Sequence, residues 1–187
     1  MALLKIARMG HPVLRAPARP IDDPGAPWVR RLVRDMIETM EDAGGTGIAA
    51  PQVHEPYRLV VFRVPEARLS DLPGDCAQDL LALVNPVVEP IGREELLDWE
   101  GCLSVPGLRG AVPRYARIRY RGLGLAGETI AREVAGFHAR VVQHECDHLD
   151  GILYPQRMRD HRLLVFVEEL QRHPIDLAAV SAAEQRA

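Results

Sequence analysis

The stretch Gln143–His148 reads QHECDH, and it decides how the rest of the chain must fold around it. In an α-helix, positions i and i+4 project from one face, so His144 and His148 would lie side by side with Glu145 next to them. Two imidazoles and an adjacent carboxylate in this HExxH spacing are typical of metal-assisted hydrolysis. The motif therefore predicts a helix that holds one metal ion together with its own acid/base group.

The residues before the motif predict that this helix is buried. Phe137, Val141, His144 and His148 follow one another at helical spacing, so the apolar stripe continues directly into the two histidines. A buried pair of imidazoles without an ion would need other polar partners, and this stripe offers none. We expect a helix over residues 136–150, with Gly151 as its C-terminal stop.

Composition and charge indicate an ordinary soluble globule. The 187 residues are 47% hydrophobic and 26% charged, which predicts a single domain over residues 1–187. The net charge is −3 and the basic residues are scattered, so no nucleic-acid surface is indicated and the partner is expected to be small or peptidic. The first residues do not form a secretory signal, and no apolar run approaches the roughly 20 residues of a membrane span, which favours a cytoplasmic location.

The three cysteines predict ligand or core roles rather than disulfides. Cys76, Cys102 and Cys146 are an odd number without framework spacing, as expected in a reducing compartment. Cys146 lies two residues after His144, about 200° round the helix, so it cannot share an ion with the histidines and is expected to be a small buried hydrophobe.

Periodicity along the chain predicts an α+β fold. An amphipathic helix is expected over residues 28–43, behind Pro27 and before two glycines, after a proline-rich wrapping segment at 11–27. Antiparallel strands are expected at 58–64, 80–85, 94–99, 116–121 and 129–134. A last helix is expected from residue 163 to about 174, followed by a loosely ordered tail. No strand–helix alternation is present, which excludes a parallel α/β sheet.

The third ligand decides what kind of enzyme the motif serves, since a catalytic site takes three protein ligands and leaves one position for water. Tyr154 stands where the metzincin pattern requires a histidine, which excludes that pattern. Glu168 follows His144 by 24 residues, a separation that a thermolysin-like site could use. Cys102 follows a predicted strand in a glycine-containing turn, and its thiolate would suit Fe(II) or Zn(II). Both candidates remain open on spacing alone.

A glycine-rich stretch, Gly45–Gln52 (GTGIAAPQ), superficially matches a dinucleotide fingerprint. That fingerprint must follow a strand and open a helix, whereas this stretch follows a helix and runs into Pro51. We interpret it as a loop whose backbone approaches a substrate and which ends in a side-chain amide donor, Gln52.

Three motifs taken together resemble the signatures of the peptide deformylases: GTGIAAPQ at 45–52, EGCLS at 100–104 and QHECDHLDG at 143–151. The segment KIARMGHPVLR at 5–15 is similar to the family's N-terminal segment, and the resemblance covers roughly residues 3–165. Ile48 stands where the family usually has leucine. The resemblance implies a small α+β domain in which antiparallel sheets surround the central HExxH helix.

The resemblance also implies an activity, removal of the N-formyl group from formyl-Met nascent peptides near the ribosome. It implies one divalent ion, Fe(II) as the native metal with zinc, nickel or cobalt as substitutes, held by Cys102, His144 and His148. A metal-bound hydroxide would attack the formyl carbon, with Glu145 as general acid/base and with Gln52 and the Leu103 N–H stabilising the oxyanion. Arg114 is expected to pair with Glu100 and fix the ligand loop. The expected substrate-binding residues are Gly45, Thr46, Gly47, Arg109 and Val141.

Two rival functions follow from the same residues. An HExxH endopeptidase would use Glu168 as its third ligand. A structural metal module would need four closed protein ligands, whereas only three are expected to converge.

Overall fold

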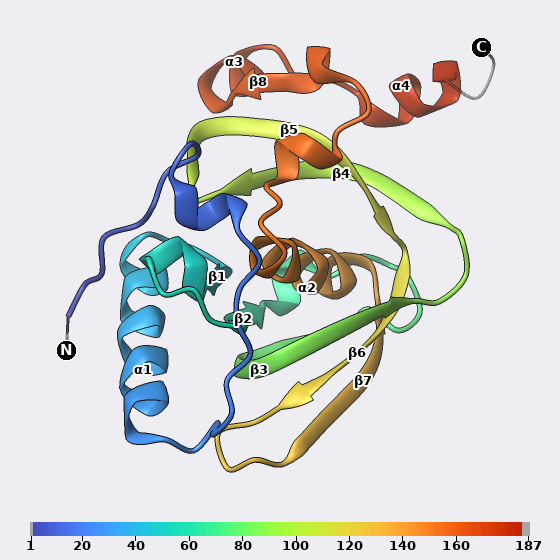
Figure 1. The fold of residues 1–187 in the computed structure, drawn as a ribbon. Helices are drawn as coiled ribbons and strands as arrows, with labels where there is room; N and C mark the ends of the chain where they lie inside the picture. The colour runs from blue at the N-terminus through green and yellow to red at the C-terminus, as the bar shows by residue number, and fades with distance from the viewer. Residues whose placement is uncertain (1, 185–187) are drawn as a thin grey trace.

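Two antiparallel sheets lie on either side of a central helix, α2 (Gly136–Leu149), in the computed structural model, which describes residues 2–184 (Figure 1). The five-stranded sheet has the order β1 (Gly47–Ala49), β2 (Leu59–Val64), β3 (Gln78–Pro90), β6 (Arg117–Leu123) and β7 (Thr129–Ala135). The three-stranded sheet has the order β4 (Glu95–Cys102), β5 (Val105–Tyr115) and β8 (Leu164–Phe166). The expected α+β class, with small antiparallel sheets about this helix, is confirmed.

Strand β2 is buried on both faces, and this joins two parts of the core. Val60 and Phe62 pack in the cluster that contains the apolar residues of α2, while Leu59 and Val61 pack in the cluster that contains α1 (Pro27–Asp42). Side chains alternate across a strand, so one short apolar run covers both helices. The five-stranded sheet therefore carries α2 on one face and α1 on the other (Figure 1).

Helix α1 confirms the amphipathic pattern expected for residues 28–43. Pro27 occupies the first turn, where a missing N–H costs nothing. The buried side chains Val29, Val33, Met36 and Met40 recur at helical spacing. Beyond the helix, Gly44 takes a positive φ of 65°, a conformation that suits glycine at a helix end.

The two ends of α2 are fixed in different ways, by a distant carboxylate at its start and by a nearby glycine at its end. At its start, the Asp75 carboxylate accepts hydrogen bonds from the N–H groups of Phe137 and His138, at 2.8 and 3.1 Å. At its end, Gly151 has a φ of 73° and its N–H donates to the His148 carbonyl. The predicted helix and its glycine stop are confirmed, and the motif is placed on a rigid element.

The strands expected at 58–64, 80–85, 94–99, 116–121 and 129–134 are present as β2, β3, β4, β6 and β7, but β5 was not predicted. Pro106, Gly107, Gly110 and Pro113 break its pattern. β8 covers only residues 108–110 of β5, so both prolines lie where the strand has a neighbour on one side alone. The glycine-rich stretch is also more regular than a loop, because residues 47–49 form β1 beside β2.

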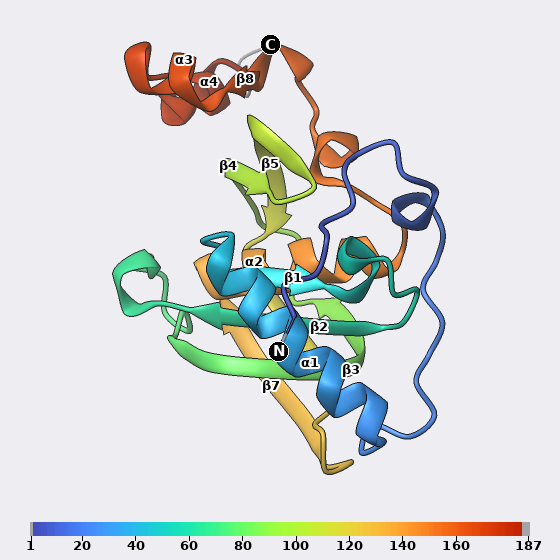
Figure 2. The ribbon, with the colours of Figure 1, turned by 90° about the vertical axis from the view of Figure 1, so that its left-hand side faces the viewer.

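The C-terminal part differs most from expectation. Residues 164–166 form β8 on the edge of β5 and not a helix, and only α3 (Val167–Arg172) matches the helix expected to about residue 174. The tail expected to be loosely ordered forms α4 (Leu177–Glu184), with Ile175, Leu177 and Val180 packed against the third core cluster. Figure 2 shows this unit beyond β4 and β5, on the side away from α1. The last three residues of the expected tail lie outside the described residues.

Short 3-10 turns join these elements: η1 (Pro12–Arg15), η2 (Ala50–Val53), η3 (Glu66–Arg68), η4 (Tyr154–Arg157) and η5 (His161–Leu163). Within residues 2–184, no helix has both the length and the apolar character needed to cross a bilayer.

Candidate active site

Three donor atoms from two elements converge beside α2. Cys102, the last residue of β4, and the two histidines of α2 each offer one ligand atom, and these atoms lie within 4.8 Å of one another. Cys102 Sγ is 3.3 Å from His148 Nε2, and the two imidazole rings cross at 86° with their centroids 5.0 Å apart. A thiolate with two imidazoles is a donor set that fits Fe(II) or Zn(II).

The two histidines have different surroundings. His144 Nδ1 lies 2.8 Å from the Glu100 carboxylate, which fixes the orientation of the ring. His148 Nδ1 is buried without a hydrogen-bond partner among the described residues. Burial first, and then the nearby His144 and Arg114, lower the pKa of His148 well below 6.5, so its ring is neutral as a metal ligand requires.

Glu100 is held by two buried arginines as well as by His144. Arg114 donates hydrogen bonds to both oxygens of the Glu100 carboxylate, at 2.8 and 2.9 Å, and Arg140 donates to Oε1 of Glu100 at 2.8 Å. Burial acts to raise the pKa of Glu100, but the charge and hydrogen bonds of Arg114, with those of His144, outweigh it and hold the pKa well below the usual range. Glu100 is therefore ionised, and the expected pairing with Arg114 is confirmed.

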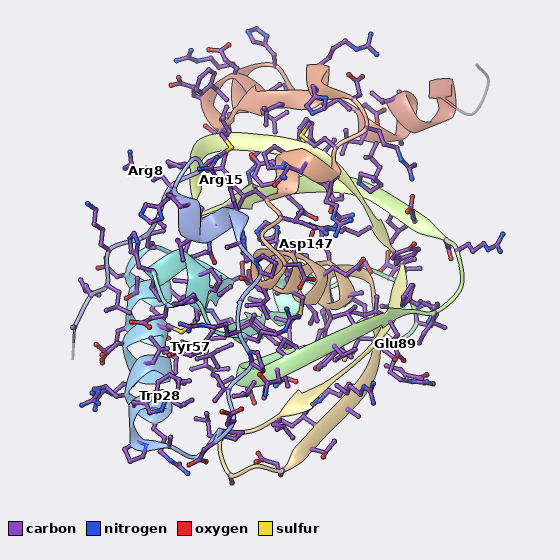
Figure 3. The ribbon with its side chains drawn as sticks, in the orientation of Figure 1. Arg8, Arg15, Trp28, Tyr57, Glu89 and Asp147 are labelled. Carbon is purple, nitrogen blue, oxygen red and sulfur yellow. The ribbon has the colours of Figure 1, made fainter. Side chains whose placement is uncertain are left out.

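A second carboxylate, Asp147, balances the charge of these arginines. It accepts a hydrogen bond from Arg114 on one side and a paired contact from Arg157 on the other. Figure 3 shows Asp147 on the central helix. The ion pairs thus run from the surface at Arg157 through Asp147 and Arg114 to Glu100, and so to the ring of His144.

Glu145 lies against β1 at the floor of a cavity. Its side chain is buried and Oε2 has no hydrogen-bond partner among the described residues. A Cβ added at Gly47 would stand only 2.3 Å from Glu145 Oε1, so the absence of a side chain at residue 47 makes room for the carboxylate. Burial, followed by the charge of Glu100, raises the pKa of Glu145 to about 7, despite the opposing effect of His144 and Arg114. A carboxylate with a pKa near neutrality suits proton transfer in both directions.

Gln52 is anchored at one end and aimed at the thiol at the other. Its Oε1 accepts the N–H of Ala49 at 2.8 Å, and its Nε2 points to Cys102 Sγ at 3.5 Å and to Ser104 Oγ at 3.2 Å. The amide is 1% exposed and its orientation is fixed by these contacts. The Gln52 amide group is therefore held beside the three donor atoms.

A cavity of about 390 Å³ brings most of the expected residues together. Its lining includes ten of them: Gly45, Thr46, Gly47, Gln52, Cys102, Leu103, Arg109, Val141, His144 and Glu145. His148 is not part of this lining and is almost completely buried. Glu168 lies exposed on α3 and does not belong to the donor group found among the described residues, so the spacing argument that kept it as a third ligand is wrong.

Several residues of the site were missed by sequence reasoning. Arg140 and Asp147, which flank His144 on α2, and Ser104, which follows Cys102, are all buried and hydrogen-bonded in the network around the donor atoms. The sequence carried one indication of these residues, because charged side chains occupy several faces of the helix α2. Such charges are found in a buried helix only when they are paired.

A group of three donor atoms, an adjacent carboxylate of raised pKa and an open cavity are the parts that a metallohydrolase site needs. The sequence model of the polypeptide deformylase family matches residues 3–163. Peptide deformylase 1 of Nitrosomonas europaea is 47% identical over 88% of this chain and 93% of its own. The crystal structure of peptide deformylase from Ehrlichia chaffeensis superposes with a TM-score of 0.79 at 31% identity, covering 86% of this chain and 90% of that one. A class I type b peptide deformylase from Acinetobacter baumannii, solved with Met-Ala-Ser bound, has a TM-score of 0.76 at 37% identity, over 84% of this chain and 99% of that one.

The chain therefore belongs to the peptide deformylase family. Members of this family are metal-dependent hydrolases that remove the N-formyl group from the N-terminal methionine of nascent chains, and the chain is an enzyme of this kind. The endopeptidase alternative has no support from the relatives or from the position of Glu168.

Proposed function

We propose that Cys102, His144 and His148 hold one divalent ion, Fe(II) in the cell, and that Glu145 is the general acid/base of deformylation. The observation that carries the proposal is the convergence of three donor atoms within 4.8 Å, next to a buried carboxylate with one oxygen that has no partner within residues 2–184. A divalent ion at this position supplies Lewis acidity and lowers the pKa of water. A thiolate donor favours Fe(II) or Zn(II), and nickel or cobalt are expected to substitute.

The residues of the chain then have separate tasks in hydrolysis. Glu145 accepts a proton from the attacking water as the new carbon–oxygen bond forms at the formyl carbon. Gln52 Nε2 and the Leu103 N–H donate to the oxygen that gains negative charge. The carbon–nitrogen bond breaks as Glu145 returns the proton to the leaving amine, which gives formate and a peptide with a free N-terminus. Because Glu145 has a pKa of about 7, neither transfer is strongly uphill at neutral pH.

The cavity lining supports the positions proposed for the substrate. Val141 and Arg109 lie on opposite elements, α2 and β5, with Gly45, Thr46 and Gly47 along a third side. We propose that these groups receive the methionine and its backbone. Met-Ala-Ser is bound in the Acinetobacter baumannii structure, which supports short methionine-led peptides as ligands here. We place the enzyme in the cytoplasm near the ribosome, because nascent chains are the family's substrates. We also propose that it is a single catalytic domain, because one family model spans residues 3–163.

The proposal is tested with protein purified without oxygen, by formate release from formyl-Met-Ala-Ser and by metal analysis. Glu145→Gln should keep its metal and lose turnover by about 10²- to 10⁴-fold, since only the proton transfer is removed. Cys102→Ala should lose metal, while Glu168→Ala should retain both metal and activity. Air should inactivate the iron form faster than the zinc form, because Fe(II) and its thiolate oxidise. Full turnover by Glu145→Gln, or full metal content in Cys102→Ala, would contradict the assignment.

A further inference from the structure

The segment that follows the family match reaches the substrate cavity. The match ends at residue 163, and β8 begins at Leu164. β8 pairs antiparallel with the part of β5 that lines the cavity, so that Leu108 lies opposite Phe166 and Arg109 lies opposite Val165. The segment is thus hydrogen-bonded to one wall of the cavity, although it lies outside the part of the chain that the family model describes.

One side chain of this segment lines the cavity directly. Val167, the first residue of α3, lies in the lining together with Leu108 and Pro106 of β5. These three side chains form an apolar wall that we call the β5–α3 wall. The wall lies where α3 and β8 pack next to β5, on the part of the molecule away from α1 (Figures 1 and 2).

The β5–α3 wall is fixed by packing behind it. Leu163 is 8% exposed in the third core cluster, and Leu164, Ile175 and Leu177 pack against the same cluster. Apolar contacts before and after Val167 therefore hold the segment against β4 and β5. A wall held at both ends can select among ligands, because its side chains are in place before the ligand binds.

A long substrate must pass out of the cavity. A volume of about 390 Å³ is at the lower end of the range for small-ligand pockets, enough for formyl-methionine but not for a chain of many residues. The formyl group has to lie near Glu145 and the Cys102 donor group, so the residues after methionine lie farther out. Val167 does not belong to the donor group or the Gln52 and Glu145 contacts, and we place it beside those later residues.

We infer that the β5–α3 wall is a subsite for an apolar side chain in the one or two residues that follow methionine. The inference rests on the proposed function, because it takes the formyl group to lie at Glu145. Burial of an apolar side chain against Val167 and Leu108 favours such substrates over polar ones, since removing apolar surface from water is favourable.

The test compares three substrates: formyl-Met amide, which ends before the wall, formyl-Met-Leu-Leu and formyl-Met-Ser-Ser. The wild type should have a higher kcat/KM for the leucine peptide than for the serine peptide. Val167→Asp should reduce that ratio by about tenfold, the discrimination typical of one apolar contact, and should leave formyl-Met amide nearly unchanged. Val167→Ala, which keeps an apolar surface, should reduce the ratio by less.

The matched control is Gln171→Glu, which adds the same charge to α3 at an exposed position outside the cavity. It should leave all three rates as in the wild type. An unchanged leucine-to-serine ratio in Val167→Asp overturns the inference, and so does an equal loss on all three substrates, which would show only a structural role. Failure of the wild type to hydrolyse formyl-Met amide at all would instead contradict the proposed function.

Discussion

Gly47 shows how a single missing side chain shapes the site. A Cβ at this position would meet three atoms of the Glu145 side chain, at 2.3, 2.6 and 2.8 Å. The backbone of residue 47 does not have a positive φ, so alanine is compatible with the conformation of β1. The glycine is therefore required by its contact with Glu145 and not by its backbone conformation.

We expect Gly47→Ala to displace the Glu145 carboxylate and to lower kcat by about 10²-fold or more, the usual contribution of a positioned acid/base group. Metal content should stay near that of the wild type, because the three atoms nearest to the added methyl all belong to Glu145, which is not one of the three donor residues. Gly101→Ala is the control, since it adds a methyl beside the same cavity with no contact closer than 3.7 Å. Equal activity in the two variants would show that Glu145 tolerates the displacement.

The residues proposed to bind the ion and to react could be predicted from motifs, and so could the Arg114–Glu100 pair, whereas Arg140 and Asp147 could not. HExxH spacing indicates the two histidines because their geometry depends on local positions along the chain. Cys102 was selected over Glu168 by the resemblance of its EGCLS motif to that of the family. Arg140 and Asp147 act through Glu100 and Arg114, which belong to β4 and β5. Contacts between distant elements leave no local pattern, so these roles required the structure.

Among the elements, α2 depends on a residue far from it in sequence. The Asp75 carboxylate accepts hydrogen bonds from the N–H groups of Phe137 and His138. It also accepts hydrogen bonds from the N–H and the hydroxyl group of Ser70. Burial acts to raise the pKa of Asp75, but these hydrogen bonds outweigh it and hold the pKa below its ordinary value of 3.8. The charged carboxylate thus caps the helix that carries the site.

We expect Asp75→Ala to lower the free energy of unfolding by about 1 kcal/mol at pH 7, the typical cost of a lost helix cap. The pKa of Asp75 is lower in the folded state than in the unfolded state. Its contribution is therefore complete above the unfolded pKa of 3.8 and is lost as pH falls through the lower folded value. Urea unfolding should show a smaller difference from wild type at pH 3 than at pH 7. Asp71→Ala, at an exposed position in the same loop, should show no difference at either pH.

Element prediction failed where sheet pairing, and not local pattern, decides the conformation. Leu164 and Val167 fit a helical repeat, yet residues 164–166 are extended because the free edge of β5 accepts their backbone hydrogen bonds. β5 itself contains two prolines and two glycines, residue types that are typical of loops, but β4 pairs with it at Val105 and along residues 110–115. Helices α1 and α2 were predictable because their apolar spacing is complete within each segment.

In the molecule as a whole, the N-terminal segment forms hydrogen bonds with two segments of the proposed site, one at Gln52 and one at Ser104. The Ala7 N–H donates to the Gln52 carbonyl at 2.7 Å, and the Met9 N–H donates to the Ser104 carbonyl at 2.8 Å. Gln52 follows β1 and Ser104 follows β4, so one extended segment joins an element of each sheet. The relative position of the proposed oxyanion donors and the proposed ligand Cys102 is therefore influenced by hydrogen bonds between segments about 45 and 95 residues apart.

The three donor residues likewise join β4 to α2, so ion binding should stabilise the whole fold. An ion present at about 100 times its Kd should add about 2.7 kcal/mol to the free energy of unfolding, because it binds only the folded chain. A chelator should remove this gain, and Cys102→Ala should show little of it. Cys76→Ser, at an exposed cysteine outside the donor group, should keep it.

The free energy of unfolding that the ion adds should also depend on pH, and it should be smaller at low pH than at high pH. In the ion-free protein, burial lowers the pKa of His144, but hydrogen bonds with Cys102 and Glu100 outweigh it and raise the pKa well above 6.5. The ion must displace this proton, and protons compete more strongly as pH falls, so its affinity and the stability it adds should be smaller at pH 6 than at pH 8. Thermal unfolding with and without zinc at the two pH values measures the difference. An equal gain at pH 6 and pH 8 would mean that no proton leaves the donor residues on binding.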